Sequence, residues 1–428
     1  MTTLNRKIAP PIHDAIEFKY NLQPINKEAL DNGIPFYWLN AGVQDVVEID
    51  WLFPAGMWQE PKPAVANATA GLLKNGTSKH SAHQIHESVE YYGASLKVNT
   101  GNDFSTVSLY ALTKDLPKLL PIIHELLTDS VFPEEEVTLH KQNAIQRLLV
   151  SLRQADFVAN QKIDALLFGE FHPYGRFTRR EKIEAVTRED LLGFFNRNYT
   201  LANARIFMAG KVGRNEVALV NDLFGKTPVV VAPPEEVPFG TPAPSEQSHR
   251  VMNDETSVQA SIRIGRTVPT RHHPDFPKMV VLNTMLGGYF GSRLMSNIRE
   301  DKGYTYGIYS SLQPMVHGGS LTIHTEVGRD VMEDAIREVY KEMNDLCTAP
   351  AAEDELLLVK NYLLGGLLGD LDGPFQILGR WRTLILHGLD EAHFNNNIRV
   401  YKEVTAAELQ ALAQEYYNKS LFYEVGVI

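Results

Sequence analysis

Residues 282–311 have the sequence "LNTMLGGYFGSRLMSNIREDKGYTYGIYSS". A Gly-rich turn comes first, and a helix that carries Arg293 and Arg299 is expected after it. Gly303 then breaks the helix, and a strand with Tyr306 follows. The segment therefore predicts a helix joined by a short turn to a strand rich in aromatic residues.

This segment belongs to a repeat that fills the chain. A Pro-rich stretch, "TPVVVAPPEEVPFGTPAP", divides the chain nearly in half, because proline favours an extended linker over a helix or a central strand. The same order of strands and helices appears on both sides of it. Corresponding features lie about 215 residues apart, which indicates a duplicated domain. The matching pairs are "VEIDWLFPAG" with "VQASIRIGRT", "STVSLYALTKDL" with "GSLTIHTEVGRDV", and "EAVTREDLLGFF" with "KEVTAAELQALA".

The repeat predicts an α+β protein of two homologous domains. Alternating apolar and polar strands favour mostly antiparallel sheets with helices packed on one face of each. We expect a first domain over 1–226, a Pro-rich linker over 227–245 and a second domain over 246–428. In the last matching pair, Val-Thr precedes an acidic residue, which predicts a capping box at each helix start.

Composition limits the function classes. The 428 residues include 52 acidic and 41 basic ones, so the net charge of −11 argues against a general binder of nucleic acid or of anionic membranes. Cys347 is the single cysteine, which rules out an internal disulfide. We see no secretory signal, no apolar run long enough for a membrane span and no nucleotide-binding Gly motif. A cytoplasmic location is expected.

The motifs resemble the pitrilysin/insulinase family of zinc metallopeptidases, which includes the mitochondrial processing peptidase. The family pattern "LNxxLGGGxxSRLxxxxREKxGLxYxV" matches 282–308 nearly residue for residue. The resemblance covers roughly 30–428 and includes "GAxLxxxT" at 93–100, "KDLP" at 114–117 and "HPYG" at 172–175. It implies two homologous α+β domains that form half of a clamshell, and two such halves enclose a peptide chamber.

The resemblance also implies that the zinc site of this chain is degenerate. Active members carry an HxxEH motif and a further Glu ligand about 76 residues later. Aligned on Gly76-Thr77, these positions hold Asn67, Ala70, Gly71 and Arg147. None of the four can replace an imidazole ligand, a general base or a carboxylate ligand. We therefore expect no zinc in this chain and no peptide hydrolysis by the chain alone.

Arg299 and Tyr306 match an Arg/Tyr pair that the family uses at the same spacing. The resemblance implies that this pair reaches a zinc site in another domain and hydrogen-bonds the substrate carbonyl and the developing oxyanion. The leading hypothesis is a non-catalytic subunit of a heterodimeric zinc metallopeptidase. Its partners would be a zinc-bearing paralogous subunit and an unfolded peptide, and zinc would be held by that partner.

The segment "LKVNTGND" occupies the position of the family's substrate-pairing edge strand. Lys97, Val98 and Asn99 are therefore candidates for substrate binding, in which backbone hydrogen bonds add a peptide strand to the sheet. The family usually has "NA" where this chain has Lys97 and Val98, so the edge has changed chemically.

Two alternatives stay open at this point. The chain could be a structural or peptide-binding protein like the core subunits of the respiratory bc complex, with no role in proteolysis. A third hypothesis is an autonomous enzyme with a rearranged site made by His80, His83 and Glu87. Because half of a clamshell buries its inner face only against a second half, some dimer is expected, and a homodimer is one candidate when the chain is alone.

Overall fold

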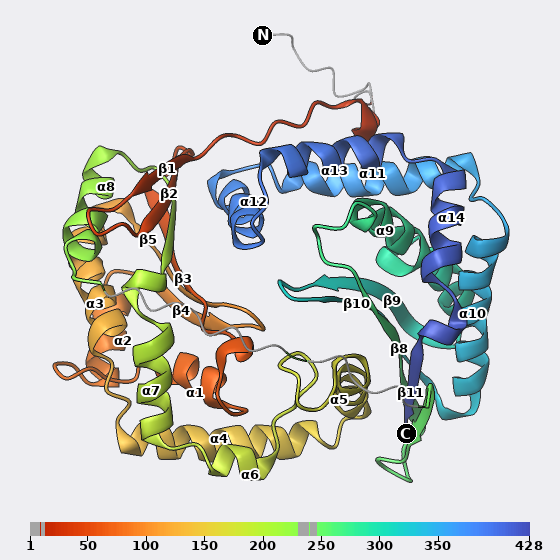
Figure 1. Ribbon diagram of the computed structural model, residues 1–428, viewed down its shortest axis with the longest axis horizontal. Helices are drawn as coiled ribbons and strands as arrows, with labels where there is room; N and C mark the ends of the chain where they lie inside the picture. The colour runs from red at the N-terminus through yellow and green to blue at the C-terminus, as the bar shows by residue number, and fades with distance from the viewer. Residues whose placement is uncertain (1–8, 10–12, 230–238, 240–245) are drawn as a thin grey trace.

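The protein is described by a computed structural model, in which residues 9, 13–229, 239 and 246–428 are placed well enough to describe. The described chain forms two halves, each built on its own β-sheet with helices packed around it (Figure 1). The α+β class and the two homologous sheets predicted from the sequence are confirmed. The domain boundaries themselves stay a prediction, because 230–238 and 240–245 of the expected linker lie outside the described residues.

The first sheet contains six strands in the order β1-β2-β6-β3-β5-β4. Its pairings are antiparallel except that between β2 and β6, which is parallel. In β3, four alternate residues pack in the first core cluster, and Leu52 faces the opposite side of the sheet. The strands are β1 (Asn26–Ala29), β2 (Pro35–Asn40), β3 (Val46–Phe53), β4 (Ser95–Thr100), β5 (Ser105–Leu112) and β6 (Arg205–Gly210).

Helices of the first half surround this sheet. The predicted capping box is present at α7, where Thr187 accepts from the amide of Asp190 at 3.2 Å. The helices and short helical turns are η1 (Ala15–Glu17), η2 (Met57–Gln59), α1 (Val65–Leu72), α2 (Ala82–Glu90), η3 (Thr113–Asp115), α3 (Leu116–Asp129), α4 (Glu134–Ser151), α5 (Ala155–Phe168), α6 (Arg180–Glu184), α7 (Arg188–Asn198), η4 (Leu201–Asn203), α8 (Arg214–Val220) and η5 (Asn221–Gly225).

The second sheet repeats the topology of the first with five strands in the order β7-β11-β8-β10-β9. The pairing of β7 with β11 is parallel, as is that of β2 with β6, and the other pairings are antiparallel. The edge strands β4 and β9 therefore occupy equivalent places in the two sheets. The strands are β7 (Ser248–Val251), β8 (Gln259–Val268), β9 (Thr305–Pro314), β10 (Gly319–Gly328) and β11 (Tyr423–Val427).

Helices of the second half follow the same order as those of the first. Thr405 caps α14 by accepting from the amide of Glu408 at 3.3 Å, which repeats the capping box of α7. The helices are α9 (Phe276–Asn283), η6 (Thr284–Gly288), η7 (Met295–Asp301), η8 (Arg329–Val331), α10 (Met332–Thr348), α11 (Glu353–Gly369), α12 (Pro374–Leu386), α13 (Glu391–Glu403), α14 (Ala406–Tyr416) and η9 (Lys419–Leu421). Within the described residues, none of the helices combines the length and the apolar character needed to cross a bilayer.

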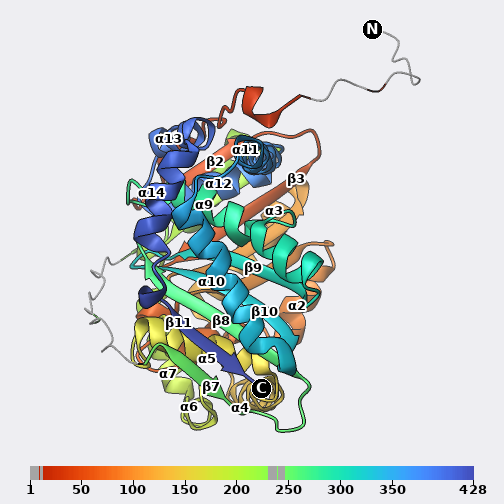
Figure 2. The ribbon, with the colours of Figure 1, turned by 90° about the vertical axis from the view of Figure 1, so that its right-hand side faces the viewer.

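One helix of each half packs on the sheet of the other half. Helix α5 lies beside β8 and β11 of the second sheet, where Ile163 packs with Val425 (Figures 1 and 2). Helix α12 packs on β2 and β6 of the first sheet, where Trp381 shares a cluster with Phe207. Arg382 of α12 also pairs with the buried carboxylate of Asp50 on β3. This exchange joins the halves and covers part of the second face of each sheet.

A smaller contact between the halves involves the turn that connects β9 with β10. The indole of Trp58 stacks on the imidazole of His317 with ring centroids 3.9 Å apart. The amide of Val316 donates to Asp103 at 3.1 Å, and the amide of His317 donates to the hydroxyl of Tyr174 at 3.2 Å. These contacts fix the β9–β10 turn of the second half against loops of the first half.

Candidate functional site

The four positions that correspond to zinc ligands lie together in the structure. Asn67, Ala70 and Gly71 of α1 line one cavity of about 470 Å³, and Arg147 of α4 lines the same cavity. The four aligned residues therefore lie around one cavity, and their correspondence to zinc-ligand positions stays a prediction. We call this space the α1 cavity; its other lining residues are Ala64, Ala68, Val98, Asn99, Thr100, His140, Lys141, Ala144, Thr178, Ile183 and Val186.

Buried groups hold helix α1 in place. Glu60 accepts a hydrogen bond from the amide of Ala66 at 2.9 Å and pairs with Arg176 at 3.0 Å. Burial raises the pKa of the Glu60 carboxyl to about 7, while the Arg176 guanidinium and the Ala66 amide oppose that rise. Val65 and Leu72 pack in the first core cluster. The helix is therefore anchored through its core side.

His140 is a residue of this site that the sequence analysis missed. A Cβ atom built on Gly71 would stand 2.9 Å from Cε1 of His140, so the imidazole occupies the space that a side chain at 71 would need. Burial lowers the pKa of His140, and the charge of Arg147 lowers it further. His140 precedes Arg147 by seven residues on α4, or two helical turns, and this spacing could have identified it.

The residues of the α1 cavity do not fit a zinc ion. Asparagine, alanine and glycine offer no imidazole or carboxylate, and arginine carries a positive charge of its own. Across the described ranges, no group of three His, Cys, Asp or Glu side chains is arranged to hold a metal.

The histidines considered for a rearranged site are directed elsewhere. His80 contacts Glu125 at 2.8 Å, whereas His83 lies 3.8 Å from Glu87 with both side chains largely exposed. The structure therefore does not bring His80, His83 and Glu87 to one site.

The candidate substrate-binding strand borders the α1 cavity. Strand β4 pairs only with β5 among the described strands, which makes it an edge of the first sheet, as predicted. Val98 and Asn99 line the cavity, whereas Lys97 is exposed and does not. An extended peptide added along this edge would thus run past α1.

Arg299 and Tyr306 lie together in the second half. The guanidinium of Arg299 is 4.5 Å from the ring centre of Phe290 and 5.6 Å from that of Tyr306. The side chain of Tyr306 is 92% exposed. In the described chain Arg299 has no ion pair, whereas Arg293 on the preceding turn donates two hydrogen bonds to Glu355, each at 2.8 Å. The pair therefore presents a cation and a phenol to solvent.

The segment that carries Arg299 is π-helical and not the regular α-helix expected. The amide of Lys302 donates at 2.9 Å to the carbonyl of Asn297, five residues earlier. This wider turn is followed by Gly303, whose φ of +65° reverses the chain into β9. The turn therefore determines where Arg299 lies relative to the first residues of the strand.

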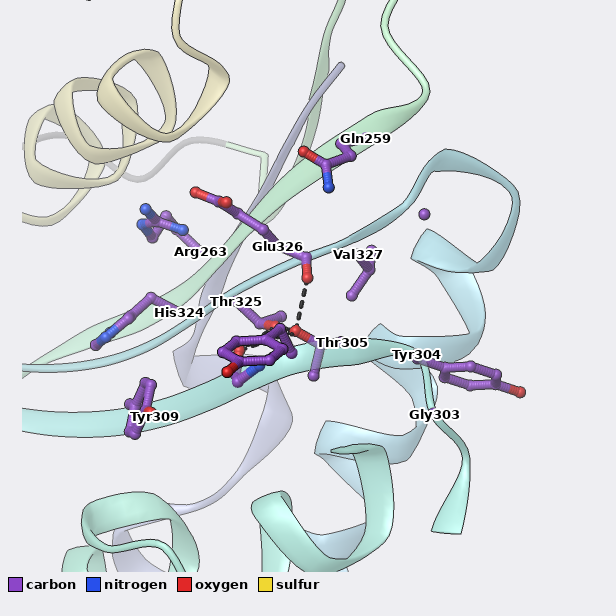
Figure 3. A pocket seen from close by; sticks show the side chains of 13 residues that line it. Gln259, Arg263, Gly303, Tyr304, Thr305, Tyr309, His324, Thr325, Glu326 and Val327 are labelled. Atoms are coloured by element: carbon purple, nitrogen blue, oxygen red, sulfur yellow. Dashed lines mark hydrogen bonds between the residues drawn. The ribbon is translucent and has the colours of Figure 1, made fainter. Parts of the chain in front are cut away.

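Tyr306 also lines a cavity of about 590 Å³ along β9, which we call the β9 cavity (Figure 3). The hydroxyl of Thr305 donates to the carbonyl of Glu326 at 2.6 Å and holds the start of β9 against β10. The cavity is lined by Gln259, Arg263, Gly303, Tyr304, Thr305, Tyr306, Gly307, Tyr309, His324, Thr325, Glu326, Val327 and Gly328. These residues all belong to the second half, so the α1 and β9 cavities have separate linings.

Comparison with known proteins identifies the family. Residues 42–167 match the model of the insulinase peptidases, family M16, and residues 185–363 match the model described as the peptidase M16 inactive domain. The chain belongs to the M16 peptidase family. An uncharacterized zinc protease of Mycobacterium leprae is 25% identical to this M16 chain over 357 residues, which cover 81% of this chain and 79% of that protein.

Solved M16 structures share the fold. The peptidase M16 inactive domain from Pseudomonas fluorescens superposes with a TM-score of 0.83 at 22% identity, covering 94% of this chain and 98% of that chain. The periplasmic protease PqqL from Escherichia coli superposes with a TM-score of 0.78 at 16% identity. All of this M16 chain is covered in that match, but only 49% of PqqL. The family resemblance inferred from the sequence is thus confirmed.

Proposed function

We propose that this M16 chain is the non-catalytic subunit of a two-subunit zinc metallopeptidase. Its Arg299 and Tyr306 would bind substrate at the zinc site of a paralogous partner subunit. The observation that carries the proposal is the contrast between the two halves. The ligand positions of the first half hold Asn67, Ala70, Gly71 and Arg147, while the Arg/Tyr pair of the second half is intact, adjacent and open to solvent.

The chemistry of the pair suits peptide hydrolysis. A guanidinium and a phenol are both hydrogen-bond donors, and they stabilise negative charge as it develops on a peptide carbonyl oxygen. Cation–π contact with Phe290 and Tyr306 orients Arg299 without neutralising it, because aromatic rings carry no net charge. Zinc would belong to the partner subunit, the substrate would be an unfolded peptide, and a cytoplasmic location stays a prediction.

The need for a partner is supported by length and by the separate linings of the two cavities. This chain corresponds to about half of the PqqL chain, so a single-chain M16 protein has room for two such units. A second M16 subunit would supply the missing half here. When the partner is absent, a second copy of this chain is the expected substitute.

The test is reconstitution of this chain with a zinc-bearing M16 partner and measurement of peptide cleavage. Arg299→Ala should lower kcat by about 100-fold, the typical loss when one donor to an oxyanion is removed. The complex should stay intact by size-exclusion chromatography, and its zinc content should not change. Lys302→Ala is the matched control, because it removes a neighbouring cation whose nearest carboxylate lies 3.9 Å away.

Two results would contradict the proposal. One is unchanged turnover with Arg299→Ala in an intact complex. The other is chelator-sensitive cleavage of a flexible peptide by this chain alone.

Peptide binding without proteolysis is the second candidate function. The α1 cavity favours it, because this cavity borders a free sheet edge but lacks zinc ligands. Failure to stimulate any zinc-bearing M16 partner, together with peptide binding by the isolated chain, would support this function over the first.

A further inference from the structure

The lining of the α1 cavity has an unusual charge for this protein. The chain has 52 acidic and 41 basic residues, yet among the described residues no Asp or Glu lines this cavity. Two cations do, Lys141 and Arg147. The described lining of the α1 cavity therefore contains no carboxylate, although the protein as a whole is acidic.

Neither cation is neutralised by a carboxylate of the described chain. Lys141 donates to the carbonyls of Glu184 and Val186 at 2.6 and 2.8 Å, which position its ammonium without cancelling its charge. Arg147 is exposed and forms no hydrogen bond or ion pair within the described chain. Its five N–H donors are free to bind a ligand.

The nearby side chains add polar groups and little charge. Asn67 of α1, Asn99 of β4 and Thr178 all line the cavity. His140 is biased toward its neutral form by burial and by Arg147. The cavity therefore combines two fixed cations with hydrogen-bonding side chains, a composition suited to an anion.

The position of the cavity indicates what kind of anion it receives. Strand β4 offers the unpaired backbone groups of a sheet edge, and three of its residues, Val98, Asn99 and Thr100, line the cavity together with Arg147. An extended peptide that pairs with this edge would place its own groups next to Arg147. Guanidinium and carboxylate make a bidentate pair, and carboxylates are the anions that every unmodified peptide can supply.

We propose that the α1 cavity is a binding site for a carboxylate of an extended peptide paired with β4, with Arg147 as the principal ligand. The carboxylate is either the C-terminus of the peptide or an Asp or Glu side chain. A fixed cation thus takes the place of a bound metal, and the site retains peptide without cleaving it. This inference does not depend on Arg299 or Tyr306.

Fluorescence anisotropy on the isolated, full-length chain tests the proposal. The probes are three extended peptides of about ten residues, each with an uncharged fluorophore at the N-terminus. The first has a free C-terminus and no acidic residue. The second is the same peptide with an amidated C-terminus, and the third is amidated with one central Glu.

At least one carboxylate peptide should bind tenfold or more tightly than the amidated, acid-free peptide. Tight binding of the first probe identifies the C-terminus as the source, and tight binding of the third identifies the side chain. Arg147→Gln should remove the advantage, and N-methylation of alternate peptide amides should weaken binding. Arg153→Gln, which removes an exposed cation further along the same chain segment and outside the cavity, should preserve it.

Equal binding of all three probes, no binding of any of them, or an advantage that survives Arg147→Gln would overturn the proposal. Because Arg147 is exposed, its substitution should not disturb folding, and circular dichroism verifies this. No partner and no zinc are used, so the result is independent of the two-subunit experiment.

Discussion

The α1–β4 region of the first half and the η7–β9 region of the second half differ in their chemistry, although the edge strands β4 and β9 occupy equivalent places in the two sheets. In each, a helical segment lies beside the edge strand of a sheet, and a cavity borders that strand. The first region carries Asn67, Ala70, Gly71 and Arg147 at the positions aligned with metal ligands, whereas the second presents Arg299 and Tyr306. The edges of the two sheets therefore present different side chains although the strand order is repeated.

The two sides of helix α1 contribute differently to its packing. Its core side packs through Val65 and Leu72, and its first turn is held by Glu60. The cavity side carries Asn67 and Gly71, neither of which belongs to the core clusters. Ligand side chains on a helix face that borders a cavity can therefore be lost at little cost in stability.

Two substitutions in the reconstituted peptidase, one in each region, should show the largest difference in their effect on kcat. Tyr306→Phe removes only the phenolic hydroxyl and should lower kcat by about 100-fold, because one donor to the oxyanion is lost. Asn67→Ala in the α1 cavity should leave kcat within about twofold, because our proposal gives it no contact with the reacting carbonyl.

Tyr309→Phe is the control for Tyr306. It changes a half-exposed tyrosine on the same strand, which lines the same cavity. A loss of kcat with Tyr309→Phe as large as that with Tyr306→Phe would assign the effect to the strand as a whole and not to the pair.

A double-mutant cycle tests whether His140 fills the space left at Gly71. Alanine favours a helix over glycine by up to about 1 kcal/mol, so Gly71→Ala should stabilise the chain in a His140→Ala background. In the wild-type background this gain should be absent, because the new Cβ would meet the ring at 2.9 Å. Urea-induced unfolding measures both values, and we expect a coupling of at least about 0.5 kcal/mol.

Gly366 provides the control for this cycle. It lies inside α11, and beyond the backbone of that helix no described atom comes within 4 Å of the position that a Cβ would take. Gly366→Ala should therefore stabilise the chain equally with or without His140. Identical effects of Gly71→Ala in the two backgrounds would show that the imidazole does not occupy the position.

The smallest expected effect is on the titration of His140. Burial and the charge of Arg147 both disfavour the imidazolium, so its pKa should lie below the ordinary value of 6.5. Because the folded-state pKa is lowered, the contribution of His140 to the free energy of unfolding is complete above pH 6.5 and decreases as the pH falls below it. The pKa is measured by NMR, with the resonance assigned through His140→Gln.

Arg147→Gln should raise this pKa because it removes the nearby positive charge, while Arg153→Gln should leave it unchanged. A pKa at or above 6.5 in the wild-type chain would contradict the proximity of the two side chains. The same variant thus reports on the electrostatics of the α1 cavity and on its proposed ligand.

Much of the candidate site could be predicted from the sequence. The spacing of Arg299 and Tyr306 indicated a pair, and the two side chains are neighbours. The alignment on Gly76-Thr77 selected Asn67, Ala70, Gly71 and Arg147, and these four residues line one cavity. Arg299 and Tyr306 are neighbours because only a short turn separates them along the chain, whereas Arg147 reaches the cavity through the contact of α4 with α1.

Local sequence is enough to predict the α+β class and the capping boxes at Thr187 and Thr405, because each depends on residues that are close along the chain. The duplication can be predicted as well, because the same motifs recur about 215 residues apart. Other features exist only in the folded chain: α5 and α12 exchange sheets, His140 packs on Gly71, and the α1 cavity contains two cations and no described carboxylate. Periodicity shows that a helix has an apolar face, but it does not show which sheet covers that face. That choice follows from the packing of segments far apart in the chain.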